Sequence, residues 1–241
     1  MREMSVPLKA VTVSTERYIM RTKHKIIAAF ALTTALFLPF YGESEAAAAI
    51  VREARYAGEN VDLHYPEIET DSLSATEEIN EELEKTMQYI RQQVRGERIK
   101  QRNDGEAQRE VRAMLDYEVT YQDKDYVSVR LNGNVDFGGA HPNPYTYAYI
   151  FRLRDGENMD LDDFRKERGK KPASRYTLTA VNQALREQAA AKGIVLYSDF
   201  TGIRELPKNI YLDSEAHIHA VFAPYEVGPY SSGAIDIDLD A

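Results

Sequence analysis

The sequence predicts an α+β fold: antiparallel strands in one or more sheets, with two helices packed on one face. Three observations lead to this prediction. Two segments, 74–94 and 177–192, repeat apolar residues at helical spacing. Other segments alternate apolar and polar residues, as half-buried strands do, and successive strands follow one another through short turns. The predicted strand segments are 59–69, 111–131 (a hairpin), 145–153, 216–222 and 234–239.

The first predicted strand, 59–69, contains Pro66, which must end the strand or place it at a sheet edge because proline has no N–H to donate. Ser74 is the expected cap of the following helix, and Glu77 completes a capping box. The polar stretch 96–110 is expected to be a connection or a frayed helix end.

From residue 111 the apolar period changes to two, which predicts a hairpin with its turn at 123–125. Tyr145, Tyr147 and Tyr149 share one face of the next strand, where packing is favoured over ligand contact. Between these strands lies a Gly- and Pro-rich loop, 137–144.

The second half of the sequence predicts a helical turn at 161–164 and a helix over 177–192 that ends at Gly193. The segment 224–230 joins the last two strands and carries Tyr225 and Tyr230 beside prolines. In the last strand, every second residue from 236 to 240 is Asp. This alternation indicates that the aspartates form the polar side of an amphipathic strand rather than a catalytic carboxylate pair.

Composition excludes several classes of protein. The 241 residues carry a formal net charge of −9, which argues against a general nucleic-acid binder. The chain has no Cys, so thiol catalysis and Cys-ligated zinc are excluded. Neither a Gly-x-Ser-x-Gly elbow nor a P-loop is present, and no cofactor is expected.

The N-terminal region predicts export. A basic stretch precedes an apolar run, 26–40, and a small-residue segment, which together are typical of a secretory signal peptide within 1–47. Translation could begin at Met20. The alternative to a cleaved signal peptide is an uncleaved signal anchor, which would be the only expected link to a membrane. Without 1–47 the formal net charge is −11, because six basic and four acidic residues lie there.

Histidines support one catalytic alternative. His217 and His219 point to the same side of a predicted strand, and His141 could join them as a third metal ligand. The spacing matches no established zinc motif, so unrelated histidines are favoured and no metal site is predicted.

Two separated motifs carry a family resemblance. Gly138-Gly139-Ala140-His141 with Leu161-Asp162-Asp163-Phe164 is the first, and the segment 221–230 is the second. They resemble an exported bacterial domain of unknown function at the C-terminus of PdaC-type peptidoglycan deacetylases and RsiV-type anti-sigma factors. Upstream, 61–66 with Ile79-Asn80 is similar to its usual N-terminal companion. The predicted organisation is therefore 1–47 signal region, 48–110 companion segment and 111–241 C-terminal domain.

The resemblance implies a limited function. Catalysis in the deacetylases belongs to a separate metal-dependent domain, which this chain lacks, and in the anti-sigma factors the corresponding domain binds lysozyme. The sequence therefore predicts a non-enzymatic, exported binding module of the cell envelope that recognises lysozyme or peptidoglycan fragments. A metal-dependent hydrolase of wall polymers is the alternative. The predicted ligand-binding residues lie on the two loops: Gly138, Gly139, His141, Pro142, Pro224, Tyr225, Pro229 and Tyr230.

Overall fold

A computed structural model describes residues 49–104, 109–167 and 173–241, which belong to one compact unit. The predicted signal region lies outside the described residues. No helix in the described ranges combines the length and apolarity needed to cross a membrane.

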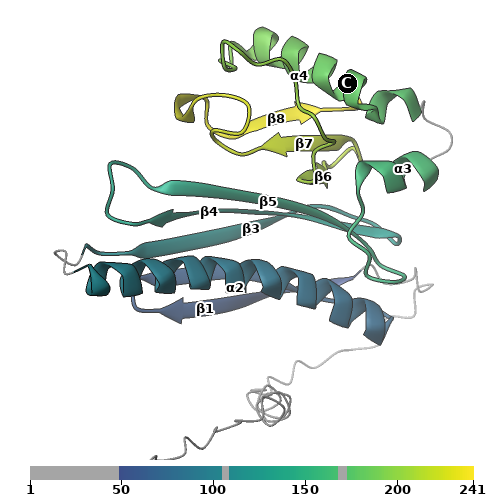
Figure 1. Ribbon diagram of the computed structural model, residues 1–241. Helices are drawn as coiled ribbons and strands as arrows, with labels where there is room; N and C mark the ends of the chain where they lie inside the picture. Colours follow the sequence, from purple (N-terminus) through teal and green to yellow (C-terminus); the bar gives the residue numbers. More distant parts are fainter. Residues whose placement is uncertain (1–48, 105–108, 168–172) are drawn as a thin grey trace, which may run out of the picture. The chain divides into compact units, whose positions relative to one another are not determined.

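Five strands form the larger sheet, in the order β1–β2–β3–β4–β5 (Figure 1). Adjacent strands of this sheet are antiparallel, except that β2 and β3 pair in parallel, residues 61–63 with residues 113–115. The α+β class is confirmed, and the antiparallel arrangement holds for all pairs but this one. The parallel pair exists because the long helix α2 provides the crossover that parallel neighbours need. The strands are β1 (Ile50–Gly58), β2 (Val61–Glu69), β3 (Arg112–Gln122), β4 (Tyr126–Asp136) and β5 (Asn143–Arg152).

β1 was not predicted from the sequence. It pairs along its whole length with β2 through a tight turn in which Asn60 has φ +58°. Asn tolerates this left-handed backbone better than most residues, so Asn60 was the available signal. Pro66 pairs with β1 and lies beyond the residues of β2 that pair with β3, as its missing N–H requires.

Helix α2 (Leu73–Asn103) packs on one face of this sheet. Its cap is Ser72, whose Oγ accepts a hydrogen bond from the Ala75 N–H at 3.3 Å, so the predicted cap at Ser74 is wrong by two residues. The helix also continues past Gly96 to Asn103, so much of the predicted connection 96–110 is helical. The apolar stripe of α2 is buried against the sheet as its spacing predicts: Ile79, Leu83, Met87, Ile90 and Val94.

The smaller sheet is antiparallel, in the order β6–β7–β8: β6 (Ile210–Leu212), β7 (Ile218–Phe222) and β8 (Ile235–Asp238). Helix α4 (Leu178–Lys192) packs beside β8 and shares its apolar core. Thr177 caps the start of α4, and Gly193, with φ +66°, ends it as predicted. The remaining helices are short: α3 (Leu161–Glu167), which begins at the predicted turn, η1 (Ala173–Tyr176) and η2 (Tyr230–Ser232).

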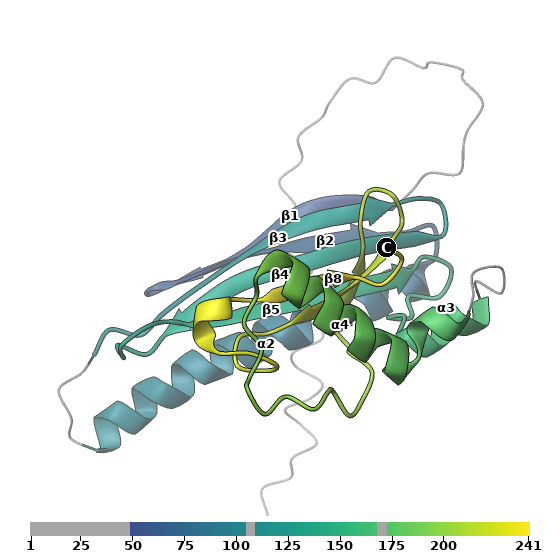
Figure 2. The ribbon, with the colours of Figure 1, turned by 90° about the horizontal axis from the view of Figure 1, so that it is seen from above.

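The two sheets are joined through the face of the larger sheet that points away from α2. There, the buried Ser128 hydroxyl accepts a hydrogen bond from the Leu212 N–H at 2.9 Å. The guanidinium of Arg130 lies 4.6 Å from the centre of the Tyr211 ring. Figures 1 and 2 show the resulting order of layers: α2, the larger sheet, the smaller sheet and α4. The two predicted helices therefore exist but lie on different sheets, not on one face.

Candidate functional site

Two loops that are distant in the chain meet through three aromatic side chains. The first loop, 137–142, joins β4 to β5, and the second loop, 223–234, joins β7 to β8. The rings of His141 and Tyr230 stack with their centroids 4.1 Å apart. The Tyr225 ring lies 5.5 Å from that of Tyr230 and 6.4 Å from that of His141. These three residues and Pro142 are called the aromatic cluster below.

Hydrogen bonds hold the aromatic cluster together at the Pro142 carbonyl. This oxygen accepts from the Tyr230 hydroxyl at 3.3 Å and lies 3.1 Å from His141 Nδ1. A carbonyl can only accept, so Nδ1 carries the proton. In the neutral ring, His141 Nε2 is then an acceptor for the Tyr225 hydroxyl, 3.2 Å away. One carbonyl and one imidazole thereby fix the orientation of both tyrosines.

Gly138 shapes the first loop. Its φ is +74°, and its N–H donates to Asp136 Oδ1 at 2.8 Å. A Cβ at this position would lie 2.6 Å from the Cβ of Arg109, so both the backbone angle and the space require glycine. A Cβ on Gly139 would meet open space, so this second glycine is not sterically required.

The second loop is closed by its own contacts. The Ala223 N–H donates to Glu226 Oε2 at 2.8 Å, and the Glu226 N–H donates to the Ala223 carbonyl at 3.0 Å. Pro224 and Pro229 directly precede the two tyrosines, and their fixed φ angles stiffen the approach to each. This bracing leaves a short turn with Tyr225 at its tip.

Tyr225 itself has an uncommon backbone. Its φ is +71°, and its side chain is 52% exposed. A left-handed residue other than glycine costs roughly 1–3 kcal/mol and persists only where its surroundings enforce it. The turn therefore presents a large ring to solvent at an energetic cost.

The structure thus brings together four of the predicted site residues, His141, Pro142, Tyr225 and Tyr230. Gly138, Pro224 and Pro229 shape the same two loops, and Gly139 lies in the first loop without being required there. The Tyr145 strand face packs as favoured: Tyr145, Tyr147 and Tyr149 lie on the α2 side, in or against the core.

His217 and His219 have a different environment. Both contact carboxylates of β8: His217 Nδ1 lies 3.1 Å from Asp238 Oδ2, and His219 Nδ1 lies 2.8 Å from Asp236 Oδ1. The other nitrogen of His219 is 3.2 Å from Asp213 Oδ2. Both ring nitrogens of His219 are therefore occupied by carboxylates.

The three histidines of the metal alternative are not assembled. His141 contacts the tyrosines, whereas His217 and His219 contact aspartates of the smaller sheet. The described ranges contain no group of three or more His, Asp or Glu side chains that could hold a metal ion.

The alternating aspartates of the last strand also differ from expectation. They are not simply a polar outer face. Asp236 accepts from the Tyr211 hydroxyl at 2.7 Å and lies 3.4 Å from Arg130 of the larger sheet. Asp240 is buried, where it accepts from the Tyr176 hydroxyl at 2.7 Å and the Ile218 N–H at 3.0 Å. Sequence alternation cannot identify such partners, because they come from other elements.

Opposing influences set the charge states in this cluster. Burial lowers the pKa of His219, but its hydrogen bonds and the charges of Asp236, Asp238 and Asp213 outweigh burial, so the net shift is upward. Burial raises the pKa of Asp236, but the hydrogen bonds from His219 and Tyr211 outweigh it, so the net shift is downward. Both shifts favour an ion pair between imidazolium and carboxylate.

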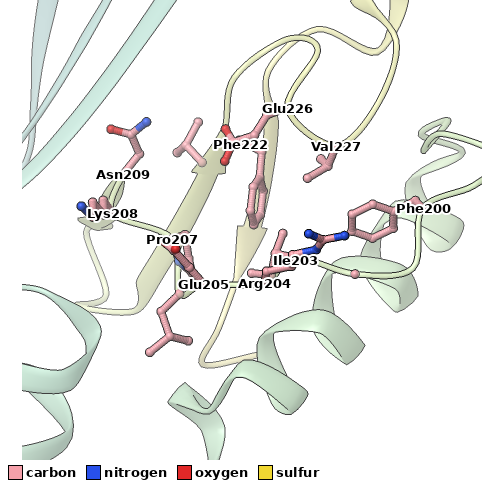
Figure 3. A pocket seen from close by; sticks show the side chains of 13 residues that line it. Phe200, Ile203, Arg204, Glu205, Pro207, Lys208, Asn209, Phe222, Glu226 and Val227 are labelled. Carbon is pink, nitrogen blue, oxygen red and sulfur yellow. The ribbon is translucent and has the colours of Figure 1, made fainter.

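Sequence reasoning also missed a cavity of about 510 Å³ beside the second loop (Figure 3). The segment 200–209, which has no regular secondary structure, forms one side, and β7 and the second loop form the other. No periodic pattern marks such a segment, so the cavity had no sequence signal. Its lining is apolar at the floor and charged at the rim: Phe200, Gly202, Ile203, Arg204, Glu205, Leu206, Pro207, Lys208, Asn209, Val221, Phe222, Glu226 and Val227.

A solved structure has a similar fold. A DUF3298 family member from Bacteroides fragilis covers 80% of this chain and 90% of its own, with a TM-score of 0.50 and 15% identity. A DUF3298 family protein from Pseudomonas aeruginosa covers 81% and 91%, with a TM-score of 0.48 and 15% identity. At this identity the similarity concerns the fold alone. No curated protein matches the sequence.

Two family models match the chain one after the other. The deacetylase PdaC model matches residues 56–144, and the model of the protein of unknown function DUF3298 matches residues 162–240. The first match includes His141, and the second includes Tyr225 and Tyr230. The pair of matches agrees with the resemblance, but the motif Gly138–His141, which the resemblance assigned to the C-terminal domain, lies within the PdaC match. Segments similar to PdaC and to DUF3298 therefore follow one another in this chain.

Proposed function

We propose that this protein is an exported, non-catalytic binding module of the cell envelope, and that the aromatic cluster is its contact surface. The proposed ligand is a lysozyme-type protein or a fragment of the cell-wall glycan. The observation that carries the proposal is the meeting of two loops at mutually oriented aromatic rings, of which those of His141 and Tyr225 are exposed and that of Tyr230 is half-buried.

The geometry of the cluster suits recognition. Tyrosine combines a large apolar surface with a polar tip, and few rotatable bonds must be fixed when it binds. The stacked rings and the hydrogen bonds at Pro142 and His141 already restrict those bonds in the free protein. Less entropy is then lost on association. The left-handed backbone of Tyr225 supports the same function, because strain of this kind concentrates at functional sites.

Charge favours a cationic partner. With the predicted signal region removed, the formal net charge is −11. Lysozymes are strongly cationic, so opposite fields would accelerate encounter and orient the two proteins. The effect of charge alone weakens as salt screens it, whereas contacts made by the aromatic cluster do not depend on salt in this way.

The test is a calorimetric titration of protein starting at residue 44 with lysozyme and, separately, with soluble peptidoglycan fragments. Saturable binding that survives physiological salt is expected with one of them. Replacing Tyr230 by Ala should weaken that binding roughly 30-fold or more, as for a central aromatic anchor. Tyr89→Ala is the control, because Tyr89 is an exposed tyrosine on α2 and lies in neither loop.

Two results would contradict the proposal. One is binding that disappears at physiological salt, which would show only the meeting of opposite charges. The other is an affinity that Tyr230→Ala leaves unchanged in a folded variant, because the contact surface would then lie elsewhere.

A further inference from the structure

The cavity beside the second loop has the features of a binding site separate from the aromatic cluster. Its volume of about 510 Å³ lies within the range of roughly 300–1,000 Å³ typical of small-ligand sites. Its apolar floor is formed by Phe200, Ile203 and Leu206, which are half-buried, whereas Val221, Phe222 and Val227 in the same lining are fully buried. In the view of Figure 3, the Phe222 ring lies at the centre, with Lys208 and Arg204 on opposite sides and Glu226 on a third.

The rim of this cavity holds charges that the protein does not use. Within the described residues, Arg204, Glu205 and Lys208 have no ion pair or hydrogen bond through their side chains. Glu226 accepts one hydrogen bond through Oε2, from the Ala223 N–H, and has no cationic partner in the described part of the chain. Two positive and two negative groups therefore surround an apolar floor without neutralising one another.

This arrangement restricts the ligand. Two cations without carboxylates would suit an anionic amphiphile such as a fatty acid, but Glu205 and Glu226 would repel it. Two carboxylates without cations would suit an amine, but Arg204 and Lys208 would repel that. A molecule with both charges and an apolar group between them complements the whole rim and the floor. Asn209, at the edge of the cavity, adds an amide that can donate and accept.

We propose that this cavity binds a short zwitterionic peptide, with an apolar side chain against Phe200, Ile203 and Leu206 and its charged ends at the rim. The site is independent of the proposed function, because the aromatic cluster and the cavity use different residues of the second loop, Tyr225 and Tyr230 for one and Glu226 and Val227 for the other.

The test uses the tripeptide Ala-Leu-Ala with free ends, added to 15N-labelled protein starting at residue 44. Saturable shifts are expected at the amides of Ile203, Leu206 and Asn209, with a dissociation constant at or below about 1 mM, the weak end of specific binding. The same tripeptide with an acetylated N-terminus and an amidated C-terminus should bind several-fold more weakly, because it lacks both charges.

Variants test the rim. Lys208→Ala should weaken binding of the free-ended peptide about three-fold, in the range of an exposed ion pair. Lys124→Ala is the matched control, since Lys124 is an exposed lysine in the β3–β4 turn, away from the cavity lining. A Tyr230→Ala variant should retain the peptide affinity, which separates failure of this site from failure of the aromatic cluster.

Three outcomes would overturn the proposal. The first is the absence of saturable shifts at the cavity amides up to about 10 mM peptide, ten-fold above the weak limit. The second is equal affinity for the free-ended and the blocked peptide. The third is tighter binding of hexanoate than of the tripeptide, which would assign the cavity to anionic amphiphiles.

Discussion

Tyr225 offers a direct test of the backbone that presents the aromatic cluster. At most positions, a protein with glycine is less stable than one with alanine by about 0.5–1 kcal/mol, because glycine loses more backbone conformational entropy on folding. At φ +71° the order should reverse. A left-handed backbone costs a residue with a Cβ roughly 1–2 kcal/mol, and glycine does not have this cost.

The magnitude follows from the difference between these two effects. Tyr225→Gly and Tyr225→Ala both lose the ring and its hydrogen bond to His141, so these losses cancel when the two variants are compared. The mid-value of the strain, about 1.5 kcal/mol, minus the mid-value of the entropy, about 0.75 kcal/mol, leaves Tyr225→Gly more stable by about 0.75 kcal/mol. For a unit of this size, that difference corresponds to a melting temperature about 1–4 °C higher.

The assay is thermal and urea unfolding of both variants, followed by circular dichroism. Tyr89 provides the control, because it is also exposed but lies within α2, where glycine should be less stable than alanine by about 1 kcal/mol. The expected result is therefore opposite signs at the two tyrosines. Tyr225→Ala equal to or more stable than Tyr225→Gly would refute the strained turn.

Two further predictions concern the first loop and the histidine cluster. Gly138→Ala should destabilise the protein by about 2 kcal/mol, through its φ of +74° and the clash with Arg109, while Gly139→Ala changes stability by less than about 0.5 kcal/mol in the same urea titration. Equal effects of the two substitutions would contradict the geometry of this loop. Because the pKa of His219 is raised in the folded protein, its contribution to stability is fully present below its ordinary value of about 6.5 and is lost as pH rises through the folded pKa. The pKa of Asp236 is lowered, so its contribution is present above its ordinary value and is lost as pH falls through the folded pKa. The free energy of unfolding should therefore decline between pH 6 and pH 9 more steeply in the unmodified protein than in a His219→Asn variant; parallel curves would show that His219 does not contribute in this way.

Local signals in the sequence were sufficient for much of the fold. The buried stripes of both long helices and the stop Gly193 all depend on residues within a few positions of one another. Signals that depend on distant partners were not visible. β6 has only three residues and is ordered by pairing with β7, and the parallel pair β2–β3 depends on a crossover through α2.

The candidate site divides in the same way. The glycines, prolines and tyrosines of the two loops were visible as loop chemistry, because turn residues act locally. The carboxylate partners of His217 and His219 were not, since Asp238 and Asp236 come from the neighbouring strand. The free charges around the cavity could not be found from the sequence either, because a charge is free only when no other element of the fold provides its partner.

The aromatic cluster depends on contact between the two sheets. His141 lies in a loop of the larger sheet, within the residues that the PdaC model matches. Tyr225 and Tyr230 lie in a loop of the smaller sheet, within the residues that the DUF3298 model matches. Ser128 and Arg130 join the sheets through Leu212 and Tyr211.

Those contacts are polar and largely shielded from water, where a hydrogen-bonding group that loses its partner costs about 1–3 kcal/mol. The two sheets are therefore held in one specific register rather than allowed to slide. A register fixed in this way lets the Pro142 carbonyl of one segment meet the Tyr230 hydroxyl of the other at 3.3 Å. The tandem arrangement thus produces a surface that neither segment carries by itself.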